Sequence, residues 1–248
     1  MRDGKQRSQL RVALGAARLE YRRRRRHRLQ PASAEVGGVK LDLSDSWATP
    51  AIREAIYDCY YEFGERCILE HTLRPDDRYL ELGGGIGVVA TYACRIVGAE
   101  NVTVYEGNPA LIDAIRGTAK LNGFQPTVIN AVLGDTDGES DFYVTPNFWA
   151  SGLTAKTGAR AIRVPMQSFG DALRRLTPTY LMADIEGAEV ELLARQLPRT
   201  LRAICMEVHP RVVGDVALQQ LLIKLLTDGF ILDVEQSMYP VLFLRRPG

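Results

Sequence analysis

Apolar residues along this chain form short runs, and amphipathic stretches with helical spacing separate them. The apolar runs predict strands near residues 78–82, 102–106, 126–132, 180–184, 202–208, 230–236 and 239–245. The amphipathic stretches predict helices near residues 86–97, 109–122, 168–176, 187–196 and 215–228. This alternation is typical of an α/β protein with a parallel, doubly wound sheet that carries helices on both faces. The last two strands lie too close together for a parallel crossover, so we expect an antiparallel hairpin at the C-terminus.

A further helix is predicted at Thr49-Pro50, because threonine caps a helix and proline suits its first turn. The spacing places four apolar side chains on its inner face, and the helix continues or restarts through Ile68-Leu69. These side chains are Ile52, Ile56, Tyr60 and Phe63. Residues 31–47 contain Gly37-Gly38 and several small polar residues, and we expect them to be irregular.

The 248 residues are 46% hydrophobic and 25% charged, which fits one α/β domain with a sizeable core. We expect a leader over residues 1–30, an N-terminal helical cap over 31–75 and a main domain over 76–248. The four cysteines form no C-x-x-C pair and no metal-ligand spacing, which predicts free thiols in a cytoplasmic protein. No apolar run reaches the length of a membrane span, and no signal-peptide core follows the basic N-terminus.

The net charge of +1 hides an asymmetry between the leader and the rest of the chain. Residues 1–30 hold eleven Lys or Arg against Asp3 and Glu20, a charge of +9, so the remainder carries −8. Residues 22–28 are basic throughout, and they are a candidate contact for RNA, anionic lipid or another polyanion. A solvated leader is the alternative, because no aromatic stacking platform accompanies the arginines.

The segment Tyr79–Gly87 (YLELGGGIG) combines a short apolar strand with a G-x-G-x-G turn. Glycines allow a sharp turn from strand to helix and let a ligand lie against the main chain. The dinucleotide pattern G-x-G-x-x-G read from Gly83 needs a small residue at position 88, which is Val88. With Glu81 two positions before the first glycine, the spacing favours S-adenosylmethionine, whose sulfonium and amino groups attract a carboxylate. A plain tight turn is the alternative.

A second acidic residue strengthens the prediction of a nucleoside cofactor. Glu106 ends the next predicted strand, about 20 residues beyond the glycines, where a carboxylate accepts hydrogen bonds from a ribose diol. An ordinary strand-end carboxylate is the alternative for Glu106. Asn130-Ala131 ends the third strand, where its backbone and amide are placed to bind an adenine edge.

Three candidate catalytic residues follow the fourth and fifth strands: Asp184, Glu186 and His209. In an open parallel sheet these strand ends meet at one edge, so the three side chains should surround the transferred methyl group. His209 is the natural base for a hydroxyl, since its usual pKa is close to neutral. Asp184 or Glu186 then orients the histidine, holds the acceptor hydroxyl or contacts the cofactor's amino group. The spacing demands no metal, and we predict none.

Other acidic residues nearby have simpler interpretations. Glu189 is expected to be a surface or capping carboxylate, and Glu207 a structural ion-pair partner. Residues 132–166 interrupt the alternation, with a short strand predicted at Ser140–Val144. Residues Asn147–Gly152 are predicted to form a lid or substrate wall, in which Phe148 and Trp149 stack on a sugar or apolar acceptor, or else anchor the loop.

Together these segments resemble the FkbM family of S-adenosylmethionine-dependent methyltransferases, and the resemblance runs from about Tyr60 to Leu244. The most specific segment is Met182–Glu189, which is similar to the family's K-x-D-x-E-G-x-E signature but has Met182 where lysine is common. Gly84-Gly85 also departs from the family's usual Ala-Asn. The other matching segments are Tyr61-Glu62, Glu81–Gly87, Glu106–Pro109, Leu121-Asn122, Ala131–Phe142 and Val164–Asp171.

The resemblance implies a Rossmann-like class I methyltransferase fold and O-methylation of a sugar, glycolipid or natural-product hydroxyl. It implies that Asp184, Glu186 and His209 face the acceptor. The residues implied to hold S-adenosylmethionine are Glu81, Gly83, Gly85, Gly87, Glu106, Asn108, Asn130 and Ala131.

Two other functions stay open from the sequence. An RNA 2′-O-methyltransferase or RNA-binding protein would use the basic leader, although the chain lacks the Asn/Asp-Pro-Pro-aromatic sequence of amino-directed enzymes. A non-catalytic binding module on the same fold is the second alternative, against which the intact glycines and Glu106 argue. Glycine spacing disfavours a nicotinamide dehydrogenase.

Overall fold

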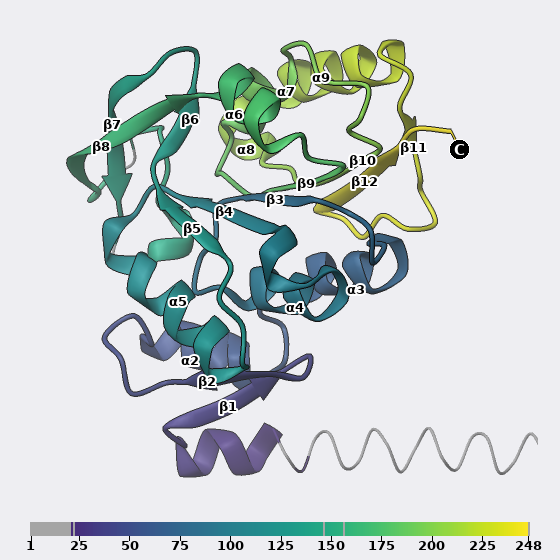
Figure 1. The fold of residues 1–248 in the computed structure, drawn as a ribbon. Helices are drawn as coiled ribbons and strands as arrows, with labels where there is room; N and C mark the ends of the chain where they lie inside the picture. The colour runs from purple at the N-terminus through teal and green to yellow at the C-terminus, as the bar shows by residue number, and fades with distance from the viewer. Residues whose placement is uncertain (1–20, 22, 146, 156, 248) are drawn as a thin grey trace, which may run out of the picture.

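The computed structural model describes residues 21, 23–145, 147–155 and 157–247. Its centre is a seven-stranded sheet in the order β11-β12-β10-β9-β3-β4-β5 (Figure 1). The bounds are β3 Tyr79–Leu82, β4 Val102–Glu106, β5 Thr127–Asn130, β9 Tyr180–Ala183, β10 Ala203–Glu207, β11 Ile231–Leu232 and β12 Val241–Arg245. Strand β12 runs antiparallel to β10 and β11, and the other pairs are parallel. This is the strand order of the class I methyltransferase fold, so the predicted fold class is confirmed.

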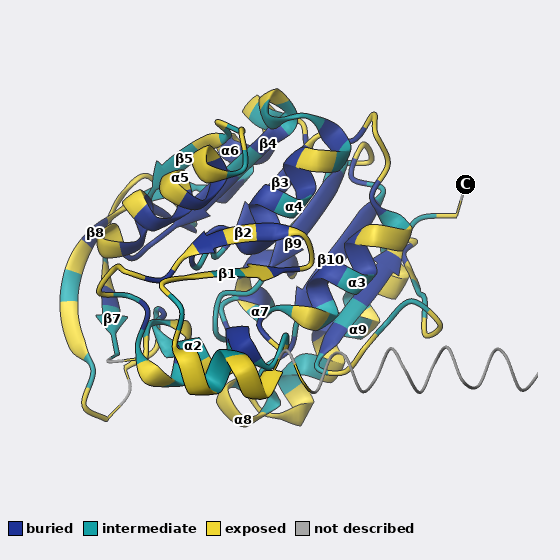
Figure 2. Ribbon diagram, turned by 90° about the horizontal axis from the view of Figure 1, so that it is seen from below, coloured by how far each residue is buried: buried dark blue, intermediate teal, exposed yellow. Residues whose placement is uncertain are grey.

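Helices cover both faces of this sheet (Figure 1). One face carries α3 Phe63–Thr72, α4 Val88–Val97 and α5 Ile112–Leu121, and the other α6 Phe169–Leu176, α7 Glu189–Leu193 and α9 Asp215–Thr227; α8 Pro210–Val213 precedes α9. The side chains of β3 alternate between two apolar clusters, with Tyr79 on the α4 side and Leu80 and Leu82 on the α6 side. All four positions of β3 are therefore buried, as Figure 2 shows for the central strands.

The segment before the sheet is more regular than its sequence indicates. Residues 31–47 were predicted to be irregular, but they contain the antiparallel hairpin of β1 Ser33–Val36 and β2 Val39–Asp42. Gly37 and Gly38 form its turn with φ angles of 55° and 80°, which glycine adopts without strain. The prediction that residues 31–47 are irregular is therefore wrong, because the two short strands gave too little alternation to indicate a hairpin.

The predicted helix at Thr49-Pro50 exists, but it is shorter than its spacing indicates. Helix α2 covers Pro50–Tyr57, and Ile52 and Ile56 are buried as predicted. Tyr60 and Phe63, predicted to point inward, are instead 78% and 43% exposed. The chain leaves the helix between α2 and α3 because two non-glycine residues there adopt left-handed conformations, which ends the helical periodicity. These two residues are Cys59 and Glu62.

The N-terminal segment packs directly on the cofactor side of the main domain. Val39 and Ile52 belong to one buried apolar cluster with Ile86 and Leu111, which flank the glycine turn and α5. The described part of the basic leader is helical over residues 23–29 and reaches the same segment. Arg23 and His27 contact the carboxylate of Asp58 at 2.6 Å and 2.7 Å. Residues 1–20 and 22 lie outside the described residues, and polyanion contact by 22–28 stays a prediction.

A second, three-stranded sheet explains the interruption of the alternation. It has the order β6-β8-β7, with β6 Val132–Gly134, β7 Gly138–Val144 and β8 Arg160–Ser168. The sequence predicted a strand only over Ser140–Val144, the C-terminal part of β7. Strand β8 was missed because its exposed residues alternate with half-buried ones, so it lacks an apolar run.

The described part of the chain contains no helix that is both long enough and apolar enough to cross a membrane. All four cysteines are free: Cys94 and Cys205 are buried, whereas Cys59 and Cys67 are half-buried.

Helix α6, which lies on the same face of the seven-stranded sheet as α7 and α9, begins with a side-chain cap. The Ser168 hydroxyl accepts a hydrogen bond from the Asp171 amide at 3.3 Å. Replacing Ser168 by alanine is expected to lower the free energy of unfolding by about 1 kcal/mol, because an amide at the helix start loses its acceptor. Urea denaturation checks this value, with Ser140→Ala in β7 as the control. An unchanged denaturation midpoint in Ser168→Ala would contradict the cap.

Candidate functional site

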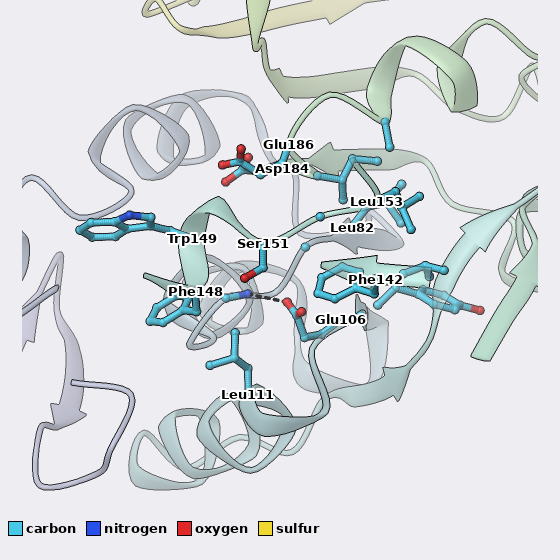
Figure 3. A pocket seen from close by; sticks show the side chains of 18 of the residues that line it. Leu82, Glu106, Leu111, Phe142, Phe148, Trp149, Ser151, Leu153, Asp184 and Glu186 are labelled. Carbon is cyan, nitrogen blue, oxygen red and sulfur yellow. Dashed lines mark hydrogen bonds between the residues drawn. The ribbon is translucent and has the colours of Figure 1, made fainter. Parts of the chain in front are cut away.

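A cavity opens at the carboxyl ends of β3, β4 and β9. The three-stranded sheet and residues 147–153 cover it from the other side (Figure 3). Acidic side chains approach it from several elements: Glu106 from β4, and Asp184 and Glu186 from the loop after β9 (Figure 3). No Lys, Arg or His is among the described residues that line it.

The glycine turn that follows β3 forms part of the cavity wall. Gly83 and Gly85 line the cavity with φ angles of 87° and 53°. A side chain at Gly83 would collide with the carbonyl oxygen of Asp184, so this glycine allows β3 and β9 to end side by side. Gly87 lies outside the lining. A Cβ there would come within 2.9 Å of the Ile115 Cα, so Gly87 allows α4 and α5 to approach closely.

Glu106 lies at the bottom of the cavity and is held by the main chain. Its carboxylate accepts hydrogen bonds from the amides of Gly85 at 3.1 Å and Asn108 at 2.7 Å (Figure 3, dashed line for the first). Burial raises the pKa of Glu106 to about 7, although these amides partly oppose the increase. Glu106, the acid predicted to bind a ribose diol, therefore lies in the cavity, and its hydrogen bond from Gly85 in the glycine turn fixes the orientation of its carboxylate.

Of the remaining residues predicted to hold the cofactor, one lines the cavity and three do not. Ala131 lines the cavity. The Asn130 amide donates to the carbonyl of Glu106 at 2.9 Å, and Asn108 accepts from the Ala110 amide, so both asparagines shape the loop. Glu81 points to the other face of β3, where it accepts a hydrogen bond from a buried tyrosine hydroxyl at 2.8 Å.

Glu62 is a site residue that sequence reasoning did not assign. It lines the cavity from a left-handed position (φ 49°) just before α3. Its Oε2 atom is buried and accepts no hydrogen bond from the described residues. Burial, followed by the charges of Glu65 and Glu81, raises the pKa of Glu62 well above its usual value. The pair Tyr61-Glu62 belongs to the family resemblance, but only the tertiary structure brings it beside Gly85.

The three predicted catalytic residues meet at the end of the cavity beyond the glycine turn. Asp184 and Glu186 line it, and the Asp184 Oδ1 atom is buried without a hydrogen-bond partner in the described structure. The His209 Nε2 atom lies 3.6 Å from Asp184 Oδ1 and 3.7 Å from Glu186 Oε1. The histidine is therefore behind the two carboxylates instead of in the cavity wall, as it reaches them from the loop after β10.

Electrostatics at this end of the cavity favour protonated acids. Burial, followed by the charges of Glu207 and Glu65, raises the pKa of Asp184 well above its usual value. Burial also raises the pKa of Glu65, to about 7, and the neighbouring charge of Glu207 adds to the increase. Glu207, predicted to be an ion-pair partner, lies 4.0 Å from the Nε2 atom of His209 through its Oε1 atom.

Two triplets of side chains here have ligand atoms within 4.8 Å of one another, close enough to surround a cation. They are Asp184, Glu189 and His209, and Glu65, Asp184 and Glu207. Glu189 already accepts two backbone hydrogen bonds, whereas Asp184 Oδ1, which belongs to both triplets, has no hydrogen-bond partner among the described residues. Proximity alone does not identify a metal site, and we assign no metal ligand among these residues.

Apolar side chains line the cavity between the two acidic ends. Phe142 comes from β7, and Phe148 and Trp149 from the short 3-10 helix η3 Phe148–Ala150, with their ring centroids 6.3 Å apart. Figure 3 shows Phe148 close to Leu111 and Trp149 farther out. Trp149 is 39% exposed, so it lies at the rim. The predicted wall over residues 147–152 is therefore present in the structure.

Comparison with known proteins indicates only distant similarity. No family model and no curated protein matches the chain. Among solved structures, fibrillarin from Aeropyrum pernix with natively bound S-adenosyl-L-methionine is 12% identical, covers 72% of this chain and 71% of its own, and has a TM-score of 0.42. Trm1 from Pyrococcus horikoshii in complex with S-adenosyl-L-methionine is 13% identical, with 87% of this chain and 62% of that chain covered and a TM-score of 0.47. A SAM-dependent methyltransferase from Agrobacterium tumefaciens is 11% identical, with 86% of this chain and 69% of that chain covered and a TM-score of 0.44. The FkbM resemblance therefore stays a prediction, and the strand order of this chain defines its fold.

Proposed function

We propose that the cavity binds S-adenosylmethionine and that the protein is an O-directed methyltransferase. The observation that carries the proposal is the position of Glu106, which ends β4 inside the cavity and bonds to the Gly85 amide. A carboxylate there is placed to accept both hydroxyls of a ribose. Phe142 and Ala131 line the adjacent part of the cavity and supply an apolar surface for an adenine ring.

The buried oxygens at the other end fit the cationic part of the same cofactor. Glu62 Oε2 and Asp184 Oδ1 are both buried and lack hydrogen-bond partners within the described chain. Buried polar atoms normally have partners, and leaving them without one is costly. A bound ammonium group would donate to such oxygens, and a sulfonium would be attracted to them.

When bound, S-adenosylmethionine supplies a methyl group whose bond to sulfur breaks, leaving its electron pair on sulfur, as a bond to the acceptor oxygen forms. The protein's part is to align that oxygen and to remove its proton. Asp184 is the candidate proton acceptor because it faces the cavity and its buried Oδ1 atom has no hydrogen-bond partner among the described residues. The proton would then move to His209 Nε2, 3.6 Å from Asp184 Oδ1.

We expect the acceptor to be a hydroxyl of a sugar, glycolipid or natural product. Support comes from the aromatic rim at Phe148 and Trp149 beside the carboxylates of Asp184 and Glu186, since sugars combine apolar faces with hydroxyl donors. No basic side chain among the described lining residues is available to hold a phosphate next to the reacting group. This disfavours the RNA alternative at the cavity itself.

Calorimetric titration with S-adenosylhomocysteine tests the proposal, with NAD⁺ titrated in parallel. Saturable binding of S-adenosylhomocysteine alone is expected, followed by methyl transfer from labelled S-adenosylmethionine to members of a panel of methyl glycosides. Binding of neither compound, or of NAD⁺ alone, would overturn the proposed cofactor.

Glu62 provides a further prediction for the same titration. Replacing it by glutamine is expected to weaken S-adenosylhomocysteine binding about tenfold, because one charge-assisted hydrogen bond to the ammonium is worth about 1.5–3 kcal/mol. Glu70→Gln, an exposed position on the helix α3 that Glu62 precedes, is the matched control and should bind normally. Unchanged affinity in Glu62→Gln would leave Asp184 as the partner of the ammonium group.

A further inference from the structure

Glu189 is a buried carboxylate whose sequence position indicated only a surface or capping role. It is 3% exposed and begins α7, immediately after the loop that carries Asp184 and Glu186. Its Oε1 accepts the amide of Ile185 at 2.7 Å, and its Oε2 accepts the amide of Gly187 at 2.9 Å. One side chain therefore binds the loop at two points on either side of Glu186.

The loop held by Glu189 has an unfavourable backbone. Glu186 adopts a φ of 55° and Gly187 a φ of 107°. A left-handed non-glycine residue persists only where its surroundings impose it, and such residues are common at functional sites. The two hydrogen bonds from Glu189 supply that restraint, and the result is that the side chains of Asp184 and Glu186 both reach the cavity.

The same carboxylate faces the inner nitrogen of His209. The Nδ1 atom of His209 lies 3.6 Å from Glu189 Oε1, and it is buried with no hydrogen-bond partner among the described residues. The opposite nitrogen, Nε2, faces Asp184 and Glu186. The imidazole ring therefore lies between one structural carboxylate and the two carboxylates that line the cavity.

We propose that Glu189 is a positioning residue, which fixes the loop of Asp184 and Glu186 and holds the His209 ring with its proton on Nδ1. The proposal rests on the proposed function and deepens it. A carboxylate beside Nδ1 favours the tautomer in which Nδ1 carries the proton, so Nε2 keeps a lone pair directed at Asp184. That lone pair is what the ring needs to take over the acceptor's proton. Glu189 acts through His209 and the loop and does not itself line the cavity.

The ion-pair contacts of His209 within 4.0 Å in the described part of the chain are all with carboxylates. Glu189 faces it from α7, Asp184 and Glu186 from the loop, and Glu207 from β10 at 4.0 Å, with Glu65 on α3 behind Glu207. Burial alone would lower the pKa of His209, but its contact with Glu189 and the charges of Glu186 and Glu207 raise it above the usual value. Removing the charge of Glu189 should therefore lower that pKa.

NMR titration of the imidazole groups tests the proposal without an acceptor. The chain has three histidines, so His209→Asn identifies the signal of His209 by its loss. In the wild-type protein, ¹⁵N shifts of neutral His209 should show the proton on Nδ1. Glu189→Gln should lower the His209 pKa, whereas Glu191→Gln, at an exposed position of the same helix, should not. A proton on Nε2 in the wild type would overturn the proposal even if Glu189→Gln fails to fold.

Activity and cofactor binding separate this proposal from the proposed function. The activity is measured with a glycoside that the wild-type protein methylates. Glu189→Gln should lower kcat about tenfold or more, because general bases contribute about 10²–10⁴-fold and a misplaced base loses part of that contribution. The acidic limb of its pH profile should move to lower pH, which a merely structural defect would not cause. An unshifted limb would overturn the positioning role. Absence of S-adenosylhomocysteine binding to the wild type, with the NMR result intact, would reject the proposed function alone.

Discussion

Replacing Glu106 by alanine is expected to weaken S-adenosylhomocysteine binding by about 100-fold or more. Two hydrogen bonds from a ribose diol to a charged acceptor are each worth about 1.5–3 kcal/mol, and about 1.4 kcal/mol corresponds to a factor of ten. The substitution also removes the acceptor of the Gly85 and Asn108 amides, which loosens the glycine turn. Isothermal calorimetry measures the change. Glu100→Ala, at an exposed position in the short 3-10 helix Ala99–Asn101 just before β4, is the control that should bind normally.

The same carboxyl group predicts how binding depends on pH. Burial raises the pKa of Glu106 to about 7, so the empty site is increasingly protonated below this pH. Only the carboxylate accepts both ribose hydroxyls, so wild-type affinity should fall as the pH falls through 7 and level off above it. Glu106→Gln cannot titrate, and it should lose this dependence. Full affinity of Glu106→Ala at pH 8 would show that the ribose binds elsewhere.

The part of the site built on local sequence was predictable. Parallel strands that alternate with helices end at one edge, so Gly83, Glu106 and Asp184 could be placed together from spacing alone. The structure brings all three to one cavity. The prediction worked here because each residue follows its own strand directly, and only the strand order had to be right.

Side chains whose role depends on tertiary packing were not predictable. Glu62 reaches the cavity because α2 and α3 are separated by a left-handed turn, which apolar spacing does not indicate. Glu81 alternates to the opposite face of β3, a consequence of strand geometry that outweighs its closeness to the glycines. His209 follows its strand as predicted, but its distance from the cavity depends on where Asp184 and Glu186 point.

The position of His209 behind the carboxylates makes Asp184 the most sensitive residue of the proposed reaction. Asp184→Asn keeps the size of the side chain but removes the group that takes the acceptor's proton. We expect kcat to fall by about 10²–10⁴-fold, the usual contribution of a general base. Because Glu62 and Glu106 stay in place, S-adenosylhomocysteine affinity should change by far less than kcat.

The comparison of kcat with affinity decides what Asp184 does. Labelled S-adenosylmethionine and the glycoside that the wild type methylates best give kcat, and calorimetry gives the affinity for S-adenosylhomocysteine. Asp113→Asn, whose side chain is 97% exposed on α5, should match the wild type in both. A large loss of affinity with kcat retained would instead assign Asp184 to the cofactor's ammonium group. Glu186, which also lines the cavity beside His209, would then be the next candidate base.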